Sequence, residues 1–593
     1  MNFFKTFFAS ILGTIIGIML LLLILFIGIM SSSGEPEPYI RSNTVLTIDL
    51  SGNIPARTVF DPFQELFPSS VHPPVSLSML KSNLQKAAAD DNISGVWIKM
   101  NRVSASWANL ESAYKYLQEF RESGKFIYAS TDDIGMNENA YYLATAADSV
   151  FSPPSTTFEF NGFVMQTSYY REMLEKIGIE PEIQRVGEYN SGVEPFLREE
   201  SSPENRVQIT ALLDNVYETF NEAVQLKSGL SLDQVNTLMN DIPEDPIARA
   251  HEHGLIDVIS FPAELEGQIK NRIGEEEDNS LRTVNIQRYN RVTPQTAGLE
   301  LPDTDNRIAV IYASGIIIPE APTGFFDNQT VITANSIKKS LDSALDDDNV
   351  KAIVLHINSG GGAASTSDLI WHHLREASKE KPVVAYMGNV AASGGYYIAM
   401  GADRVLASAN TITGSIGIYS MMFNTRELYN NKLGIHFEEF KTHDHADLNL
   451  MTRPLTPSER DALQRNIRNG YELFLERVAN SREMSRDEVH EVAQGRIWTG
   501  KDALNNRLID QVGNLDTALE SAAELAEIDA YKTVTYPEKK DFFEILFGSA
   551  QARIESWTQS LIPYSQEIRT VEELMSHNAG RNWLVLPVEF RIE

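Results

Sequence analysis

The 593-residue sequence predicts two α/β domains in tandem behind an N-terminal transmembrane helix. Three observations support this fold class. A long uncharged run opens the chain, the remainder repeats its own pattern once, and each copy alternates short β-branched segments with helical ones. A chain of this length also exceeds what a single hydrophobic core usually supports, so several domains are expected.

The opening run from Phe7 to Met30 contains no charged residue and predicts a membrane anchor. As a helix it would extend roughly 36 Å, enough to cross a hydrocarbon layer of ~30 Å. It is longer than the apolar core of a usual signal peptide and no clear cleavage site follows, so we expect residues 1–30 to form a cytoplasmic N-terminus and an uncleaved anchor. Lys5 precedes the run and Glu37 follows it, which by the positive-inside rule places the rest of the chain outside the cytoplasmic membrane.

The chain then repeats itself at an offset of roughly 256 residues. DDNISGVWIKMN, which ends at Asn101, matches DDNVKAIVLHIN, which ends at Asn358; AYYLATAADSV from Ala140 matches GYYIAMGADRV from Gly395. An offset that stays nearly constant in this way indicates a tandem duplication. Because each copy alternates strand-like and helix-like segments, we expect a mostly parallel sheet with covering helices in each.

These patterns predict the domain boundaries. We expect a first repeat at 43–282, a polar linker at 283–305, a second repeat at 306–535 and a C-terminal extension at 536–593. In the extension, apolar residues such as Phe542, Leu546 and Trp557 recur at helical spacing. This spacing predicts a helix that packs on its own domain or on a sister subunit, with a membrane-surface helix as the alternative.

Composition excludes several classes of function. The net charge of −31 and pI near 4.8 argue against nucleic acid as a partner, because little positive charge is available to neutralise phosphates. The absence of cysteine excludes disulfides, thiolate catalysis and cysteine-ligated zinc. We expect neither a metal nor an organic cofactor.

The two copies differ where chemistry is expected. The second copy reads GNVAASGGYY, with Ser393 between alanines and glycines, whereas the first reads DDIGMNENAYY, with Asn137 near the matching position. Small neighbours leave a hydroxyl reachable, which suits a nucleophile, although a serine here could also cap a helix. The second copy alone has SGGGAAS, from Ser359, after its strand. Such a glycine run predicts either a tight turn or backbone N–H groups that bind an oxyanion.

Several motifs together resemble a known family, the signal peptide peptidases SppA (protease IV) in their long, duplicated, membrane-anchored form. They are AASGGYY around Ser393, ITGSIGI at 412–418, RVGEYNSGVEPF at 185–196 and QGRIWTGKDAL at 494–504. The resemblance implies two ClpP/crotonase-like domains, a homotetramer, and a single-pass protein of the bacterial inner membrane whose catalytic part is periplasmic. It implies a serine endopeptidase of the Ser/Lys dyad type that degrades cleaved signal peptides and other hydrophobic peptides.

Carried over to this sequence, the resemblance makes Ser393 the nucleophile that forms an acyl-enzyme. Gly394, with Gly361 or Gly362, would then supply the oxyanion hole. The family's general base is a lysine in the motif G-x-Y-K-S-x-V-E-P-F, but this chain reads GEYNSGVEPF, with Asn190 at that position. An amide is not basic near neutral pH, so the change affects the central step of the reaction.

Three explanations for Asn190 remain open. A substitute base could exist, with His443 and His445 as candidates by their intrinsic pKa and Glu188 as a weaker one. The chain could instead be a slow or inactive scaffold that still binds peptides, although its serine motif is intact. Finally, the asparagine could come from a sequencing or engineering change, since a single base change converts a lysine codon into an asparagine codon. An acyl-CoA enzyme on the same core is a further, weaker competing class.

Overall fold

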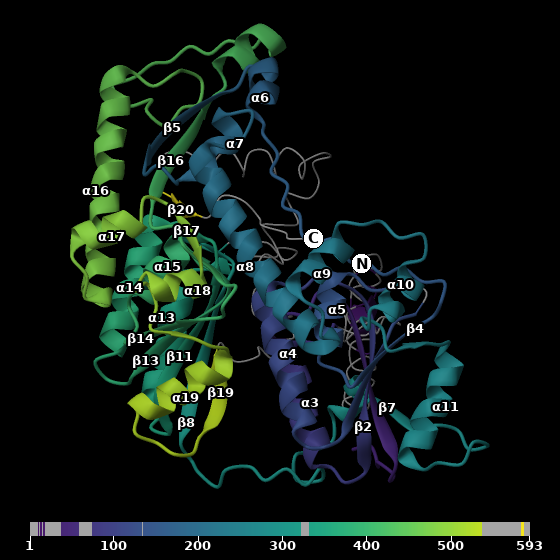
Figure 1. Ribbon diagram of the computed structural model, residues 1–593. Coiled ribbons are helices and arrows are strands. Elements are labelled where there is room, and N and C mark those ends of the chain that lie inside the picture. Colours follow the sequence, from purple (N-terminus) through teal and green to yellow (C-terminus); the bar gives the residue numbers. More distant parts are fainter. Residues whose placement is uncertain are drawn as a thin grey trace.

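The computed structural model of the chain describes residues 37–57, 74–132, 134–321, 331–536 and 583–585, with scattered positions among the first twenty. Figure 1 shows two lobes, one from each repeat, with the long helix α8 (Pro203–Ser228) between them. An arm that contains β5 (Glu180–Val186), β16 (Ile418–Asn424) and α16 (Pro457–Arg482) rises above the second lobe.

The first repeat folds around a parallel sheet with the strand order β6-β4-β3-β2-β1-β7. Its strands are β1 (Thr44–Gly52), β2 (Ile93–Val103), β3 (Phe126–Ser130), β4 (Ser149–Ser152), β6 (Val258–Ile259) and β7 (Thr283–Asn285). Strands β1 and β2 are buried on both faces, as expected for parallel strands that helices cover on both sides.

Helices cover both faces of this first sheet. The main face packs against α3 (Leu77–Ala89), α4 (Trp107–Arg121), α5 (Glu138–Ala144), α8, α9 (Leu232–Met239) and α10 (Pro246–Glu252). The other face packs against α11 (Pro262–Ile273), which buries Leu265 and Ile269. Serine side chains cap the N-termini of α3, α4, α8 and α9, so the sequence itself sets where these helices begin.

The second repeat builds the same sheet, with the order β19-β8-β11-β13-β14-β18. These strands are β8 (Arg307–Ser314), β11 (Val350–Ser359), β13 (Val383–Ala392), β14 (Arg404–Ala407), β18 (Gln511–Val512) and β19 (Lys532–Tyr536). Beyond β14, strand β13 also pairs with β15 (Ile412–Gly414), which pairs with β17 (Ile497–Thr499). The helices are α13 (Ala334–Asp346), α14 (Ala364–Ala377), α15 (Gly394–Ala399), α16, α17 (Arg486–Val492), α18 (Gly500–Asn505) and α19 (Leu515–Leu525).

Matching hydrogen bonds confirm the duplication at the level of single residues. Tyr141 donates its hydroxyl to the Leu255 carbonyl at 2.8 Å, and Tyr396 donates to the Leu508 carbonyl at 2.7 Å. In the same way, the carboxylate of Asp148 accepts from the Ile127 N–H, and that of Asp403 accepts from the Val383 N–H, both at 2.8 Å. The two copies have therefore kept their internal packing, so their differences locate changes of function.

A third sheet joins the two repeats. Its order is β10-β9-β12-β20-β16-β5, in which only β5 comes from the first repeat. The remaining members are β9 (Ile316–Ile317), β10 (Val331–Ile332), β12 (Gly361–Ala363) and β20 (Trp583–Val585). Strand β5 pairs antiparallel with β16 over its whole length, from Glu180 opposite Asn424 to Val186 opposite Ile418. This pairing carries the segment after β5, which contains Asn190, into the second repeat.

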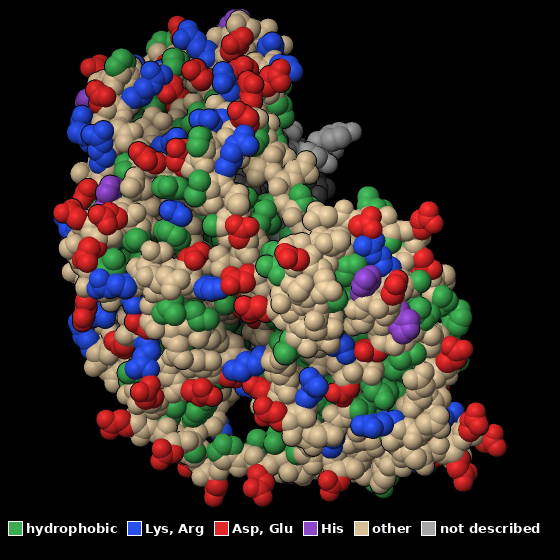
Figure 2. Space-filling model, viewed as in Figure 1, with side chains coloured by type: hydrophobic (Ala, Val, Ile, Leu, Met, Phe, Trp, Pro, Cys, Tyr) green, Lys and Arg blue, Asp and Glu red, His purple; other side chains and the backbone are tan. Residues whose placement is uncertain are grey.

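The structure corrects the expected start of the linker, but it does not describe most of the expected anchor or the expected C-terminal helix. The segment expected to start the linker at 283 instead forms β7, an edge strand of the first sheet, because Val45 to Thr47 of β1 pair with it. Most of Phe7–Met30 and the helix expected around Leu546 lie outside the described residues. Within the described part of the chain, no helix is both long and apolar enough to span a bilayer. Figure 2 shows acidic and basic side chains interspersed over one face of the molecule.

Candidate active site

Ser393 occupies a sharp turn between strand β13 and helix α15. Its backbone has φ 53° and ψ −115°, in the region that favours glycine, and its side chain makes no cap hydrogen bond to the helix. The turn is held on both sides, because the Ser393 N–H donates to the Gly414 carbonyl at 2.9 Å and the Ser393 carbonyl accepts from the Tyr397 N–H at 2.8 Å. A strained backbone held by its surroundings is typical of functional sites, and here it presents an uncommitted hydroxyl.

The small residues around Ser393 are required by close packing. A Cβ added at Gly395 would lie 2.3 Å from the Ser359 carbonyl oxygen, so no other residue fits this position without movement. Ala391 and Ala392, which precede the serine, are fully buried. The alanine and glycine neighbours therefore let the end of β13 approach the end of β11 directly.

The glycine run after β11 forms a strand and not merely a tight turn. Gly361 has φ 106°, a conformation open to glycine, and its N–H donates to Ser359 Oγ at 3.1 Å. A Cβ at Gly362 would lie only 1.9 Å from the Ile317 carbonyl oxygen of β9. Both glycines are thus needed for β12 to enter the third sheet beside the nucleophile.

On its other side, β12 pairs with an extended apolar segment of the same chain. Trp583–Val585 runs antiparallel to β12, with Gly361 opposite Val585 and Gly362 opposite Leu584. The same segment reaches β16, where Trp583 lies opposite Tyr419. The space between β12 and β16, at the end of the strand that carries Ser393, therefore accepts an extended backbone.

Asn190 lies beside the nucleophile although it comes from the first repeat. It is 5% exposed, and its side-chain N–H groups donate to the carbonyls of Val186 and Ile418, both at 3.2 Å. Ser393 Oγ has a long contact of 3.5 Å with the carbonyl of Gly417, the residue before Ile418. The structure thus brings the two predicted positions to the same short segment, Gly417–Ile418.

No basic side chain contacts the serine hydroxyl in the part of the chain that the structure describes. The Gly417 carbonyl is the one hydrogen-bonding partner of Ser393 Oγ there. The Asn190 amide is already committed as a donor to two carbonyls and has no basic lone pair on nitrogen. The site therefore holds a buried serine, 2% exposed, whose hydroxyl contacts no basic side chain among the described residues.

The alternative bases lie elsewhere in the same chain. Glu188 is exposed on a turn, and His443 is exposed with its ring against the Thr442 hydroxyl. His445 contacts Glu459 at 3.0 Å, in the first turn of α16. Ile418 touches the same helix near Gly470, which is eleven residues further along and so about 16 Å from Glu459. Within one chain, the histidines are therefore not brought to Ser393.

His445 belongs instead to an ion-pair network at the top of the arm. Arg453 makes bidentate contacts with both Asp447 and Glu459, at 2.7 to 2.9 Å. These hydrogen bonds hold the pKa of each carboxyl well below its ordinary value. The network fixes the loop that carries both histidines. Among the described residues, no group of three or more acidic or histidine side chains is arranged to hold a metal ion.

The corresponding turn of the first repeat, between β3 and α5, is closed by the side chain of Asn137, which directly precedes the position that matches Ser393. Asn137 caps α5, where its Oδ1 accepts from the Ala140 N–H at 3.2 Å. The same oxygen accepts from the Val103 N–H at 3.0 Å, and Nδ2 donates to the Val103 carbonyl at 2.8 Å. The first repeat therefore has no free hydroxyl and no open strand end at this corner.

The sequence did not single out several residues that support the site. Ser359 positions Gly361, Gly414 holds the Ser393 N–H, and Gly417 and Gly495 leave room for Asn190. A Cβ at Gly495 would lie 2.6 Å from the Asn190 Cβ. Gly414, Gly417 and Gly495 stand in the ITGSIGI and QGRIWTGKDAL motifs. The motifs therefore marked these glycines, but the sequence did not show that they pack against Ser393 and Asn190.

Fold and site together place a serine at a strained turn, beside the place where the chain's own residues Trp583–Val585 pair with β12 and β16. The family model for peptidase family S49 matches residues 119–271 and 375–529, one match in each repeat and together more than half of the chain. The chain belongs to peptidase family S49 and is SppA-like.

Named relatives agree with this assignment. The chain is 35% identical over 508 residues to "Serine protease SPPA, chloroplastic" from Arabidopsis thaliana, covering 85% of this chain and 72% of the relative. It is 32% identical over 503 residues to "Protease 4" from Salmonella typhi, covering 82% of this chain and 79% of the relative. A solved structure of a ClpP1 mutant from Listeria monocytogenes matches 35% of this chain and 94% of its own, with 15% identity and a TM-score of 0.24.

Proposed function

We propose that this chain is a membrane-anchored serine endopeptidase that acts on extended apolar peptides, including cleaved signal peptides. Ser393 Oγ would attack the peptide carbonyl, so that a C–O bond forms, the C–N bond breaks and the serine proton passes to the leaving amine. Water would then hydrolyse the acyl-enzyme and release the serine. The N–H groups of Gly394 and of Gly361 or Gly362 are the candidate donors to the oxyanion.

One observation above all supports this proposal. The segment Trp583–Val585, which consists of apolar residues, lies with its backbone between β12 and β16, beside the turn that carries Ser393. A peptide substrate that adds as a strand at the same place would find backbone partners along its length and the nucleophile at its end. Because backbone pairing does not depend on side chains, such a site suits peptides of varied sequence.

A second candidate function is favoured by Asn190. With an amide at the base position, the same groove would bind peptides with slow or no turnover. This candidate and the first share the nucleophile turn, the groove and the substrate class. They differ only in whether a group takes the proton from Ser393, so a single substitution separates them.

The experiment is hydrolysis of a fluorogenic apolar peptide by the detergent-purified full chain. We expect Asn190→Lys to raise kcat/KM by about 10²- to 10⁴-fold, because a desolvated lysine supplies the missing general base. Asn190→Met is the matched control, since it gives a similar length without a base, and it should leave the rate unchanged. Adding Ser393→Ala to Asn190→Lys should abolish cleavage.

Three results would change the proposal. Cleavage by Asn190→Lys/Ser393→Ala would exclude Ser393 as the nucleophile. Cleavage by the unaltered chain as fast as by Asn190→Lys would require a substitute base, which His443→Ala and His445→Ala would then locate. No cleavage by any variant, with peptide binding retained, would favour the peptide-binding scaffold.

We also propose that Phe7–Met30 anchors the chain in a bacterial inner membrane, with the two repeats on the periplasmic side as part of a homotetramer. The support is the uncharged run itself and the charges that flank it. Protease added outside spheroplasts should degrade both repeats if this topology is right, and light scattering in detergent should give four copies. Protection from protease, or a monomer mass, would contradict the corresponding part.

A further inference from the structure

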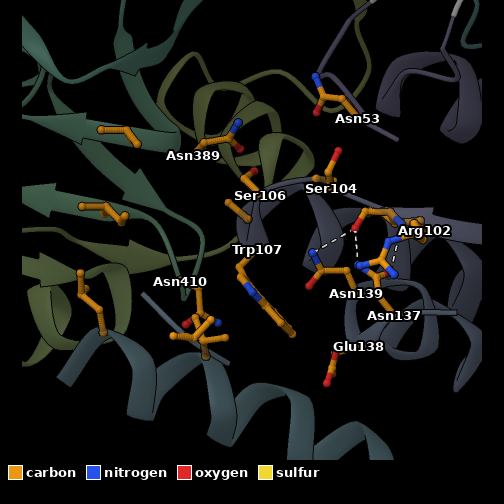
Figure 3. A pocket seen from close by; sticks show the side chains of 18 of the residues that line it. Asn53, Arg102, Ser104, Ser106, Trp107, Asn137, Glu138, Asn139, Asn389 and Asn410 are labelled. Atoms are coloured by element: carbon orange, nitrogen blue, oxygen red, sulfur yellow. Dashed lines mark hydrogen bonds between the residues drawn. The ribbon is translucent and has the colours of Figure 1, made fainter. Parts of the chain in front are cut away.

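Between the two repeats lies a cavity of about 1030 Å³ that the proposed reaction does not use (Figure 3). Its wall includes Gly52 and Val103 at the ends of β1 and β2, the first turns of α4 and α5, and Val390 and Ile412 of the second repeat. In open α/β sheets, ligands bind outside the carboxyl ends of the strands, which is the edge where this cavity lies. The cavity is therefore a candidate binding site to which both repeats contribute.

Three polar atoms in its wall lack partners among the described residues. They are the indole Nε1 of Trp107 and the side-chain carbonyl oxygens of Asn389 and Asn410. Trp107 is 5% exposed and Asn410 is 6% exposed, and both line the cavity together with Asn389 (Figure 3). Buried polar atoms in folded proteins nearly always have a hydrogen-bond partner. A fitting ligand must therefore offer at least two donors and one acceptor.

The charged groups of the wall already have partners within the protein, which favours a neutral ligand. Arg102 forms an ion pair with Glu159. Glu138 accepts hydrogen bonds from the backbone N–H groups of Asn161 at 2.8 Å and Gly162 at 3.2 Å. The other polar groups of the wall are side-chain amides and hydroxyls, with asparagine the commonest residue. These groups favour an uncharged polar partner over a phosphate or a carboxylate.

The aromatic surroundings disfavour a saccharide. Trp107 is the one aromatic residue that lines the cavity, and its ring packs against Tyr142, Phe163 and Phe220, with centroids 5.2 to 6.5 Å apart. The ring is thus surrounded by other aromatic side chains, and its N–H group is the part without a partner among the described residues. A peptide backbone alternates donors and acceptors, which is what the unpartnered amide and indole groups require.

The cavity also lies close to the nucleophile. Val390 pairs with Ile412, and the next pairs along these strands, Ala391–Thr413 and Ala392–Gly414, lead to Ser393. Three residues of strand separate Val390 from Ser393, or about 10 Å. A chain that lies in the groove at Ser393 could therefore extend toward this cavity within a few residues.

We propose that the cavity binds an uncharged polar stretch of polypeptide. It would act as an exosite for the polar part of a peptide whose apolar part lies at Ser393, and this second clause rests on the proposed function. Asn137 already occupies both backbone groups of Val103, so the peptide is held by side-chain groups and not by addition to β2.

The test measures binding and needs no cleavage. A fluorescein-labelled peptide of Gly, Ser and Asn is titrated by anisotropy against the full-length Ser393→Ala protein in detergent. Trp107→Phe keeps an aromatic ring but removes the indole N–H together with the five-membered ring that carries it, and should weaken binding about five-fold. Val164→Trp, at the rim where the native side chain is 63% exposed, should weaken binding about ten-fold or more by narrowing the mouth.

Trp371→Phe is the matched control, because its indole N–H donates to the Met400 carbonyl away from the cavity and its loss should leave Kd unchanged. The exosite is disproved if the polar peptide does not bind, or if Trp107→Phe and Val164→Trp bind it as well as the parent. Displacement by a maltooligosaccharide would assign a saccharide site, and full displacement by an apolar peptide would indicate one groove only. Failure of the peptidase assay would leave this result standing, since the parent protein lacks the nucleophile.

Discussion

The two repeats differ in the turn that joins the third strand of each sheet to the short helix after it. Ser393 and Asn137 both stand between the third strand of their sheet and a short helix, but Ser393 has φ 53° and Asn137 has φ −97°. The Asn137 amide caps its helix and bridges Val103, whereas the Ser393 hydroxyl caps nothing. In the first repeat the backbone at this turn is unstrained and the Asn137 side chain fills it. In the second repeat the backbone is strained and the serine hydroxyl does not cap the helix. Such a strained turn is what the role proposed for Ser393 requires.

The pair Gly395 and Ala140, which the sequence repeat aligns, shows the same contrast. Gly395 leaves no room for a Cβ against the Ser359 carbonyl, but the first repeat has Ala140 at the matching position, and Ala140 is fully buried. The ends of the second and third strands therefore approach more closely in the second repeat. This close approach is what places the glycine strand β12 beside the nucleophile.

The largest expected effect tests whether only one corner can react. In the Asn190→Lys background, Ser393→Ala should lower kcat/KM at least about 10³-fold and abolish labelling by a fluorophosphonate. Adding Glu138→Ser, the position that matches Ser393 when Tyr141 is paired with Tyr396, to that double variant should restore nothing, because the first repeat lacks the strained turn and a glycine strand. Labelling of residue 138, or restored peptide cleavage, would show that the two turns are equivalent and that the comparison is wrong.

The second prediction tests the packing difference. Gly395→Ala should lower the free energy of unfolding by about 3 kcal/mol, since the new methyl meets the Ser359 carbonyl at 2.3 Å unless the turn moves. Ala140→Gly should cost only about 1 kcal/mol, the usual cost of glycine within a helix. Urea denaturation of both variants measures the two values. Equal costs would mean that the two corners are packed alike.

The smallest expected effect concerns the contact between the repeats. Glu111 of α4 accepts from the Asn410 N–H of the second repeat, whereas Asp368, at the matching position of α14, accepts from the Tyr397 hydroxyl within its own repeat. Burial raises the pKa of Glu111 to about 7. Between its unfolded pKa and about pH 7 the folded state binds more protons, so stability should fall as pH rises through that range and level off above it.

Glu111→Gln should remove this pH dependence and stabilise the protein by about 2 kcal/mol at pH 8, where the native carboxylate is charged and partly buried. Thermal unfolding from pH 4.5 to 8 measures it. Glu122→Gln, exposed at the end of the same helix, is the control and should leave the profile unchanged. A profile that Glu111→Gln does not flatten would mean that Glu111 is solvated between the repeats.

The sequence by itself determined the local and repeated features of this protein. The α/β class and the duplication follow from short-range patterns, namely alternating strand and helix periods and matching motifs, and a serine among small residues makes Ser393 the predicted nucleophile. Each of these features depends on residues that are close together in the sequence, so it can be predicted without knowing how the domains pack against each other. Even Asn190 was located by its motif, although the sequence could not say what surrounds it.

Only the tertiary structure decided the contacts between distant segments. Asn190 bonds to Ile418, 228 residues away, because β5 pairs with β16 across the repeats. The same docking forms the cavity around Trp107, and the length of the arm separates His445 from Ser393. Such contacts depend on the shapes of two folded domains and on which faces they bury against each other. No local pattern in the chain encodes that docking, so only the folded molecule reveals it.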